Sequence, residues 1–384
     1  MTFEFATAQR VIFGPGTFRQ AGVIVKEFGR RALVVTGRSV VRAQPLGELL
    51  AAAGVAWEIF PIAGEPTTQA VRGGVERARA AECDCVIGFG GGSAMDAAKT
   101  IAGLLANGGE LLDYMEVIGR GAPLTKQAAP LLAIPTTAGT GAEVTRNAVL
   151  ASPEDRVKAS LRSPHLLPRV ALVDPELTRD LPPDLTASTG MDALTQLIEP
   201  YVCLRANPMT DALCVEGMRR AARSLRRAFE RGDDASARED MALASLFGGL
   251  ALANAGLGAV HGFAAPIGGM FPAPHGAVCA ALLPGVMEAN IRALRERARE
   301  SGTLHRYDEV ARLLTGRPQA TADDGVAWVR EICGELRVAP LRTWAVTEAD
   351  VPTVVEKAAQ ASSMKANPVV LTAAELSEVL AAAR

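Results

Sequence analysis

The 384-residue sequence is poor in aromatic residues, in histidine and in net charge. Phe, Trp and Tyr make up 4% of the chain, and only four residues are histidine. The formal net charge of −2 provides no electrostatic basis for binding nucleic acid or an anionic membrane. We therefore expect neither of these partners, and a small molecule instead.

Signals for export and for membrane insertion are also missing. The start, Met1-Thr2-Phe3-Glu4-Phe5, has no basic segment followed by an apolar one, so no secretory signal is expected. The six cysteines form no CxxC pair, which is typical of reduced thiols in a cytoplasmic protein. The longest stretch without Asp, Glu, Lys or Arg runs from Met241 to Met287, but polar residues, glycines and prolines interrupt it. We predict buried core and loop there rather than a membrane span.

The first half of the chain alternates short apolar runs with helical segments. The runs predicted as strands include 31–36, 55–60, 84–89, 131–135 and 170–174. Helices are predicted between the first of these, over 45–53 and 67–80. This alternation predicts a parallel sheet covered on both faces, which binds ligands beyond the carboxyl ends of its strands.

A glycine-rich turn, Gly90-Gly91-Gly92-Ser93, follows the third strand of this series. Residues without side chains let a ligand approach the backbone, and Ser93 is predicted to cap the helix that follows. The free N–H groups at a helix start attract an anion such as a phosphate. The alternative is an ordinary strand–helix turn that happens to be rich in glycine.

A second loop of hydrogen-bond donors follows the strand 131–135. The segment Thr136–Thr145 contains four threonines and two glycines, and we predict that it holds the ribose or pyrophosphate opposite the glycine turn. Taken alone, a threonine-rich turn is more often structural, but two donor loops at strand ends of one sheet favour a nucleotide site. Lys158 follows in a short extended segment.

The pattern changes after Pro183, where long Ala-, Leu- and Arg-rich segments with helical period begin. We predict an α/β domain over 1–183 and an all-helical domain over 184–384. Helices are expected near 184–202, 208–231, 235–255, 275–294, 307–314, 322–336, 348–361 and 373–383.

The helical half contains a possible metal site. Asp192 and Gln196 are four residues apart, so they share one helix face. His261 and His275 lie among glycines and prolines, and together the four side chains suit a divalent transition metal. The alternative is that the two histidines are core or capping residues with ordinary hydrogen-bond partners.

Taken together, these motifs make the chain resemble the iron-containing (group III) alcohol dehydrogenase family. The resemblance covers nearly the whole length. It rests on Gly90-Gly91-Gly92-Ser93-x-x-Asp96-x-x-Lys99, Pro135-Thr136-Thr137-Ala138-Gly139-Thr140-Gly141-x-Glu143-Val144-Thr145, Gly190-Met191-Asp192-Ala193-Leu194, His261-Gly262 and Pro274-His275-Gly276. It implies a dinucleotide-binding α/β domain followed by a helical domain, as in dehydroquinate synthase-like architectures, and a homodimer.

The resemblance also implies the residues of both sites. NAD or NADP would be contacted by Gly91, Gly92, Ser93, Asp96, Thr136, Thr137, Thr140 and Lys158. A divalent metal, Fe²⁺ by family or Zn²⁺ or another ion, would be held by Asp192, Gln196, His261 and His275. The implied reaction is reversible hydride transfer between an alcohol or aldehyde and NAD(P), with the metal polarising the substrate oxygen.

Two departures from the family pattern affect this hypothesis. Gln196 stands where the family usually has histidine, so we expect weaker metal binding and less preference for zinc. Ala265 stands where a further histidine is common, so that residue cannot relay a proton, and water, a threonine hydroxyl or the cofactor ribose would have to do so.

Other functions remain open at this point. The altered ligands motivate a metal-independent enzyme similar to maleylacetate reductase, which reduces a keto acid, with Arg146 as a candidate carboxylate anchor. A lyase similar to dehydroquinate synthase would need more lysines and histidines. A nucleotide-binding protein with a decayed site is the non-enzyme alternative. Arg38 follows the strand 31–36, at a place where NAD-specific sites often carry an acidic residue, so NADP is as compatible as NAD.

Overall fold

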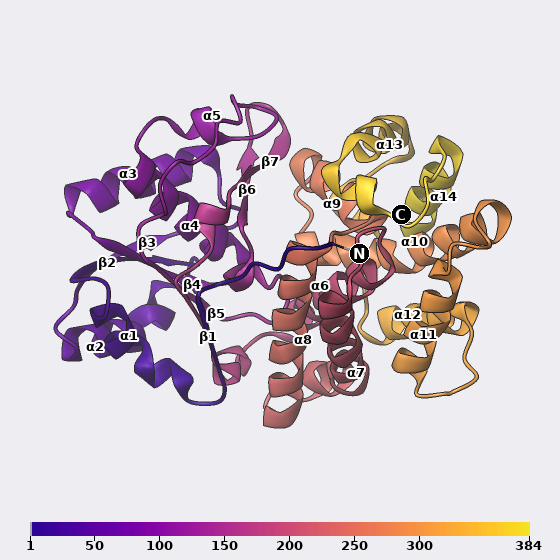
Figure 1. The fold of residues 1–384 in the computed structure, drawn as a ribbon, viewed down its shortest axis with the longest axis horizontal. Helices are drawn as coiled ribbons and strands as arrows, with labels where there is room; N and C mark the ends of the chain where they lie inside the picture. The colour runs from indigo at the N-terminus through magenta and orange to yellow at the C-terminus, as the bar shows by residue number, and fades with distance from the viewer. Residues whose placement is uncertain (1) are drawn as a thin grey trace. The chain divides into compact units, whose positions relative to one another are not determined.

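A computed structural model describes residues 2–384 and divides into two compact units (Figure 1). The first unit comprises residues 6–137 and 141–178, and the second comprises 2–5, 138–140 and 179–384. The first is an α/β fold and the second is helical, which confirms the predicted fold class. The predicted boundary after Pro183 falls at the first residue of a long helix.

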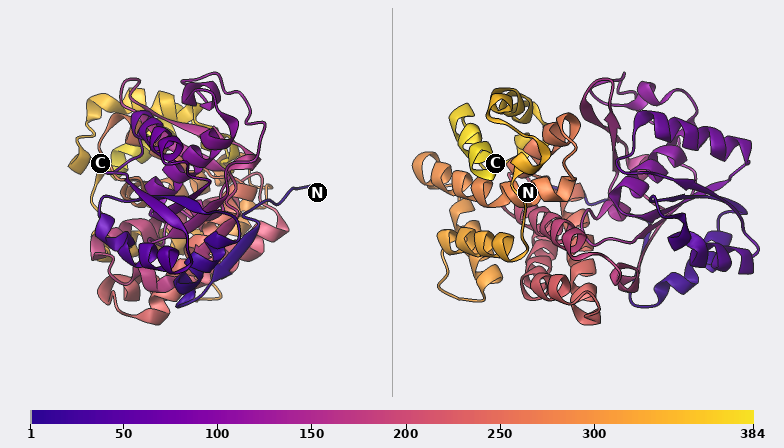
Figure 2. Two further views of the ribbon diagram at one scale, coloured as in Figure 1. Left: turned by 90° about the vertical axis from the view of Figure 1, so that its left-hand side faces the viewer. Right: turned by 180° about the vertical axis from the view of Figure 1, so that it is seen from behind.

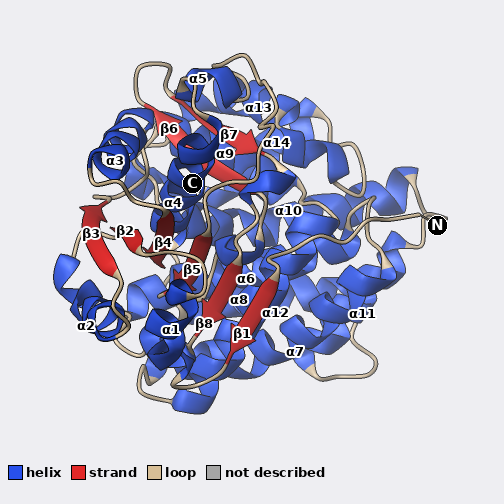
Figure 3. Cartoon of the chain, turned by 60° about the vertical axis from the view of Figure 1, so that its left-hand side comes forward, coloured by secondary structure: helices blue, strands red, loops and turns tan. Residues whose placement is uncertain are grey.

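A six-stranded parallel sheet forms the centre of the α/β unit (Figure 3). Its order is β1-β8-β5-β4-β2-β3. The strands are β1 (Arg10–Phe13), β2 (Arg31–Thr36), β3 (Ala56–Pro61), β4 (Cys85–Gly90), β5 (Leu131–Pro135) and β8 (Val170–Val173). The predicted strands at 31–36 and 131–135 match the observed ones residue for residue.

Alternate side chains of β2 enter opposite cores, as the period of two in a strand requires. Leu33 and Val35 belong to the core under α3 and α4, whereas Ala32 and Val34 belong to the core under α1 and α2. Figure 1 shows these two helix pairs on opposite faces of the sheet. Their bounds are α1 (Ala21–Lys26), α2 (Gln44–Ala52), α3 (Thr68–Ala80) and α4 (Gly92–Asn107), with the short α5 (Leu111–Tyr114) following.

An antiparallel hairpin, β6 (Asn147–Ser152) and β7 (Val157–Arg162), follows the threonine-rich loop. The extended segment around Lys158 was predicted, but β6 was not. In the β6 sequence Val149 and Leu150 stand among small and polar residues, which gives only a short β signal. Its strand conformation is fixed by pairing with β7 and by packing on α4.

The second unit is built from helices (Figure 2), and most of its buried apolar side chains belong to one large core cluster. The helices are α6 (Pro183–Val202), α7 (Pro208–Glu230), α8 (Ala235–Asn254), α9 (Ala259–Met270), α10 (His275–Arg297), α11 (Thr303–Thr315), α12 (Ala322–Glu335), α13 (Val351–Gln360) and α14 (Ala373–Ala383). Of these, α9 was not predicted as a helix, because Gly262, Pro266 and a Gly pair weaken its helical signal.

Helix α10 is long and apolar enough to cross a membrane by length and composition. However, 67% of its most apolar window is buried inside the protein's own fold, as in a core helix. The charge-free stretch from Met241 to Met287 thus forms part of α8, all of α9 and the first half of α10, with many of its side chains in the main core cluster.

Candidate metal centre and cofactor loops

Three polar side chains lie on the buried part of α6. Asp192, Gln196 and Glu199 are spaced by four and three residues, which places them on one face of the helix. All three are at most 4% exposed. Because a buried polar group is costly without a partner, this face needs hydrogen-bond donors or a cation opposite it.

Glu199 and Asn367 hold the start of α9 in place. The N-cap residue Gly258 offers no side chain, and the N–H groups of Val260 and Ala259 donate instead to Glu199 Oε1 (2.7 Å) and Asn367 Oδ1 (3.1 Å). These bonds satisfy donors that a helix start leaves unpaired. They also fix the position of His261, the third residue of α9.

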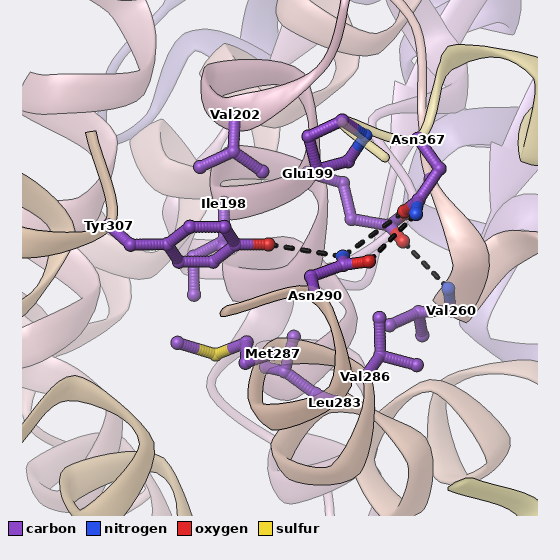
Figure 4. A pocket seen from close by; sticks show the side chains of 12 residues that line it. Ile198, Glu199, Val202, Val260, Leu283, Val286, Met287, Asn290, Tyr307 and Asn367 are labelled. Atoms are coloured by element: carbon purple, nitrogen blue, oxygen red, sulfur yellow. Dashed lines mark hydrogen bonds between the residues drawn. The ribbon is translucent and has the colours of Figure 1, made fainter. Parts of the chain in front are cut away.

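A hydrogen-bonded network supports this helix start (Figure 4). Asn290 and Asn367 exchange two side-chain bonds of 2.7 and 3.2 Å, and Asn290 Nδ2 also donates to the Tyr307 hydroxyl (3.1 Å). Beside the network lies a cavity of about 10 Å³, roughly the space of one water molecule. The polar groups behind Glu199 are therefore linked to one another and anchored in the helical core.

Glu199 also sets the protonation of the His261 ring. His261 Nδ1 lies 2.6 Å from Glu199 Oε2, and a carboxylate oxygen can only accept, so Nδ1 is the donor. In the neutral ring this leaves a lone pair on Nε2, and a carboxylate partner on the other nitrogen is the usual arrangement for a metal-binding histidine.

Four side chains bring one ligand atom each to a common point. Asp192, His261, His275 and Cys279 offer atoms that all lie within 4.8 Å of one another. Asp192 Oδ1 is 3.5 Å from His261 Nε2 and 3.7 Å from His275 Nε2. Cys279 Sγ is 3.9 and 3.7 Å from the same two nitrogens. Three of the four predicted metal ligands are thus shown to be neighbours.

Two of the buried polar atoms on this face of α6 lack a hydrogen bond. Asp192 Oδ1 and Gln196 Oε1 are buried oxygens without a hydrogen-bond partner. Both are acceptors, and Asp192 Oδ1 lies 3.5 Å from His261 Nε2, which carries a lone pair in the neutral ring. Acceptors that face one another in a buried site need a cation between or beside them, so the residues present fit a divalent metal.

The electrostatics of the site favour positive charge. Burial alone would raise the pKa of Asp192, but His275 and His261 bring it below the ordinary value. Burial alone would lower the pKa of His261, but Cys279 and then Glu199 raise it well above the ordinary value. The site therefore attracts a proton or a metal ion.

The glycine turn lies where the sequence placed it, at the end of β4. A Cβ at Gly90 would lie 2.8 Å from Ala94 Cβ, which no side chain can tolerate, so this position requires glycine. The prediction that Ser93 caps the next helix is wrong. Helix α4 begins at Gly92 with Gly91 as its N-cap and without a side-chain cap, because the helix starts one residue earlier than the hydroxyl.

The threonine-rich loop joins the glycine turn directly. Thr136 N donates to Gly90 O (2.9 Å), and a Cβ at Gly91 would lie 3.3 Å from the Thr137 side chain. Gly91, Gly92, Ser93, Thr136 and Thr137 are thus brought together at the ends of two neighbouring strands. Thr140 belongs to the segment 138–140, which is grouped with the helical unit.

Two predicted cofactor residues make internal contacts. Asp96 accepts from Val149 N (3.0 Å) and pairs with Lys99 Nζ (3.2 Å). Lys158 Nζ lies 3.0 Å from Glu65 Oε1. These contacts give both side chains a role within the α/β unit, and their contact with a nucleotide stays a prediction.

Two residues of the candidate metal centre were missed from the sequence. Glu199 is seven residues after Asp192 and continues the polar face of α6, and Cys279 is four residues after His275 on α10. A search of the same helix face one or two turns after each predicted ligand would have found both residues.

Comparison with known proteins covers both halves of the chain. The family model described as iron-containing alcohol dehydrogenase matches residues 8–175, and the model of the C-terminal part of the Fe-containing alcohol dehydrogenase family matches 186–384. Alcohol dehydrogenase 4 of Schizosaccharomyces pombe is 34% identical over 378 residues, covering 97% of this chain and 87% of the relative.

Two further relatives are named for propanediol. The 1,3-propanediol dehydrogenase of Klebsiella pneumoniae is 35% identical over 376 residues, covering 95% of each chain. The crystal structure of a 1,3-propanediol oxidoreductase superposes with a TM-score of 0.92 and 32% identity, covering 100% of both chains. The similarity therefore extends over sequence and fold alike.

Proposed function

The chain belongs to the iron-containing alcohol dehydrogenase family, and from this premise we propose that it transfers hydride between a small alcohol or aldehyde and NAD(P), with a divalent metal at Asp192, His261 and His275. It is an oxidoreductase that acts on CH–OH groups, and its family uses NAD(P) and a metal. We also propose that the protein is cytoplasmic and that it forms a homodimer.

One observation supports the proposal most strongly. The buried oxygens Asp192 Oδ1 and Gln196 Oε1 have no hydrogen-bond partner, and two imidazole nitrogens lie 3.5 and 3.7 Å from the first of them. A decayed site would be expected to fill such a position with apolar side chains or internal hydrogen bonds. The donor set of this chain is still suited to a cation.

When bound, the metal supplies a Lewis acid for the substrate oxygen and the nicotinamide supplies or accepts the hydride. Glu199 holds the His261 ring in the tautomer that leaves Nε2 unprotonated. Asp192 contributes a negative charge, since the nearby histidines keep its pKa low. The N–H groups at the start of α4 offer a binding site for the cofactor pyrophosphate, beside Thr136 and Thr137.

The proton of the alcohol needs a path that does not use Ala265. This residue lies one turn after His261 on α9 and carries no titratable group. Solvent, a threonine hydroxyl or the cofactor ribose must therefore accept the proton. A histidine in place of Ala265 is expected to change the pH profile of kcat more than the metal content.

Chelation tests the metal part of the proposal. We expect oxidation of short alcohols and diols to be lost after treatment with a chelator, and to return with added Fe²⁺, Zn²⁺, Mn²⁺ or Ni²⁺. Unchanged turnover in a preparation shown by metal analysis to be metal-free would contradict it. Such a result, combined with reduction of a keto acid by the same batch, would favour the metal-independent alternative.

A further inference from the structure

We propose that Cys279 is a thiolate ligand of the metal, so that this chain binds the ion through Asp192, His261, His275 and Cys279. The inference rests on the proposed function, because it concerns the same metal. It changes the expected chemistry of the site: a charged sulfur takes the place that the sequence prediction gave to the neutral carboxamide of Gln196.

The distances among the four atoms agree with tetrahedral coordination. Zinc lies about 2.3 Å from sulfur and about 2.0–2.1 Å from nitrogen, so a tetrahedral ion would separate S and N by about 3.6 Å. Cys279 Sγ is 3.7 Å from His275 Nε2 and 3.9 Å from His261 Nε2. The nitrogens are 3.7 and 3.5 Å from Asp192 Oδ1. These four distances are close to the ideal lengths, so little movement is needed to close the site on an ion.

Hydrogen bonding of the thiol does not account for this arrangement. A thiol has one proton and can donate it to only one of the two imidazole nitrogens. In the neutral ring His261 Nε2 has the lone pair, because Nδ1 donates to Glu199. One thiol proton therefore leaves acceptors unsatisfied, and Asp192 Oδ1 has no hydrogen-bond partner at all. A metal ion satisfies all four ligand atoms at once.

The position of Cys279 on the chain supports the same role. It follows His275 by one helical turn on α10, so both side chains lie on one face. Its side chain is fully buried, which removes it from solvent oxidants and competing thiols. In the part of the chain that the structure describes, Cys279 is the one cysteine in a potential metal-binding group.

A thiolate changes which metal the site prefers. Thiolate and imidazole ligands favour Zn²⁺, whereas oxygen ligands suit Mn²⁺. Asp192 and Cys279 together bring two negative charges, which balance a divalent cation. On binding, the Cys279 Sγ–metal bond forms and the thiol proton leaves to solvent. The site is then softer than one completed by the oxygen of Gln196.

Substitution with Co²⁺ tests the role of Cys279 directly, because a Co²⁺–thiolate bond gives an intense charge-transfer absorption in the near ultraviolet. We expect this band in the metal-stripped, Co²⁺-loaded wild type at one Co²⁺ per chain. It should disappear in Cys279→Ser and persist in Cys333→Ser, a matched control on α12 outside the site. The ratio of Zn²⁺ to Mn²⁺ affinity should fall in Cys279→Ser alone, because the variant lacks the thiolate that favours Zn²⁺.

The wild-type spectrum decides the matter even if a variant fails to fold. A wild type that binds one Co²⁺ without the thiolate band overturns the role of Cys279 and leaves the proposed metal-assisted function standing. A band that survives in Cys279→Ser overturns it as well. A wild type that binds no Co²⁺, Zn²⁺ or Mn²⁺ overturns both this inference and the metal part of the proposed function.

Discussion

Glu199 and His261 form a hydrogen bond of 2.6 Å between Oε2 and Nδ1, buried between α6 and the start of α9. The same carboxylate accepts from Val260 N through its other oxygen. One side chain therefore fixes both the backbone and the ring of the segment that carries His261. This double contact explains how His261, a candidate metal ligand, is positioned on a helix whose sequence is rich in glycine.

The Glu199→Gln variant should bind the metal more weakly. An amide has one oxygen, so it can accept from His261 Nδ1 or from Val260 N but not from both, and it lacks the charge that makes the ring a better ligand. Loss of such an outer partner commonly costs about 10- to 100-fold in metal affinity. Competition with a chromophoric chelator measures the affinity, and Glu216→Gln, at a partly exposed residue of α7, is a suitable control. Equal affinities for Glu199→Gln and wild type would show that the carboxylate charge is not needed.

The Gly91→Ala variant tests the cofactor loop. The added Cβ would lie 3.3 Å from the Thr137 side chain and would occupy the space at the start of α4 that a pyrophosphate needs. We expect the Kd for NAD(H) to rise about tenfold or more, which corresponds to about 1.4 kcal/mol of binding energy. Metal content should not change.

Gly73→Ala is the matched control for this change. It lies on α3, where an added Cβ meets only Phe60 Cζ at 3.9 Å. Isothermal titration of the cofactor into both variants gives the comparison. Similar cofactor affinities in the two proteins would remove the glycine turn from the binding site.

Arg38 offers a test of the choice between NAD and NADP. Arg38 is exposed and lies two residues after the end of β2. Its neighbour Gly37 lies beside the glycine turn, because Gly37 N would be 3.4 Å from a Cβ on Gly90. A carboxylate there would repel the 2′-phosphate of NADP and bind the 2′-hydroxyl of NAD. Arg38→Asp should therefore lower the ratio of kcat/KM for NADPH to that for NADH about tenfold or more. An unchanged ratio would mean that Arg38 does not contact the ribose.

The sequence predicted the parts of the fold that have a strong periodic signal. Buried strands such as Arg31–Thr36 are continuous apolar runs bounded by turn residues, and their positions could be predicted to within one residue. The hairpin strand β6 and helix α9 could not, because their conformations depend on contacts with distant residues. Asn367 and Glu199, far apart in sequence, supply the hydrogen bonds that start α9.

The sequence predicted most of the candidate ligands of the site, but it did not predict how their side chains are arranged in space. Asp192, His261 and His275 stood out by residue type and neighbours, and the structure brings them together. Cys279 has no distinctive neighbours in the sequence, and a buried cysteine is usually an ordinary core residue. Only the closeness of its sulfur to two imidazole nitrogens distinguishes it.

Glu143 links the pH to the stability of the α/β unit. This residue of the threonine-rich loop is 2% exposed, and burial raises the pKa of its carboxyl from 4.5 to about 7, with Lys99 acting in the opposite direction. Between pH 4.5 and about pH 7, the Glu143 carboxyl is therefore protonated in the folded state and ionised in the unfolded state. Between these two pKa values stability falls as the pH rises, by up to about 3 kcal/mol once the pH exceeds the folded pKa.

The Glu143→Gln variant has the same shape and never ionises, so it should lose this component of the pH dependence. We expect its urea midpoint to match that of the wild type near pH 5 and to exceed it near pH 8. Other titrating groups, Asp96 and Lys99 among them, are present in both proteins and largely cancel in the comparison. If the difference between the two midpoints were the same at both pH values, Glu143 would have to be ionised throughout that range in the folded protein, and its burial would then require a cationic partner stronger than Lys99.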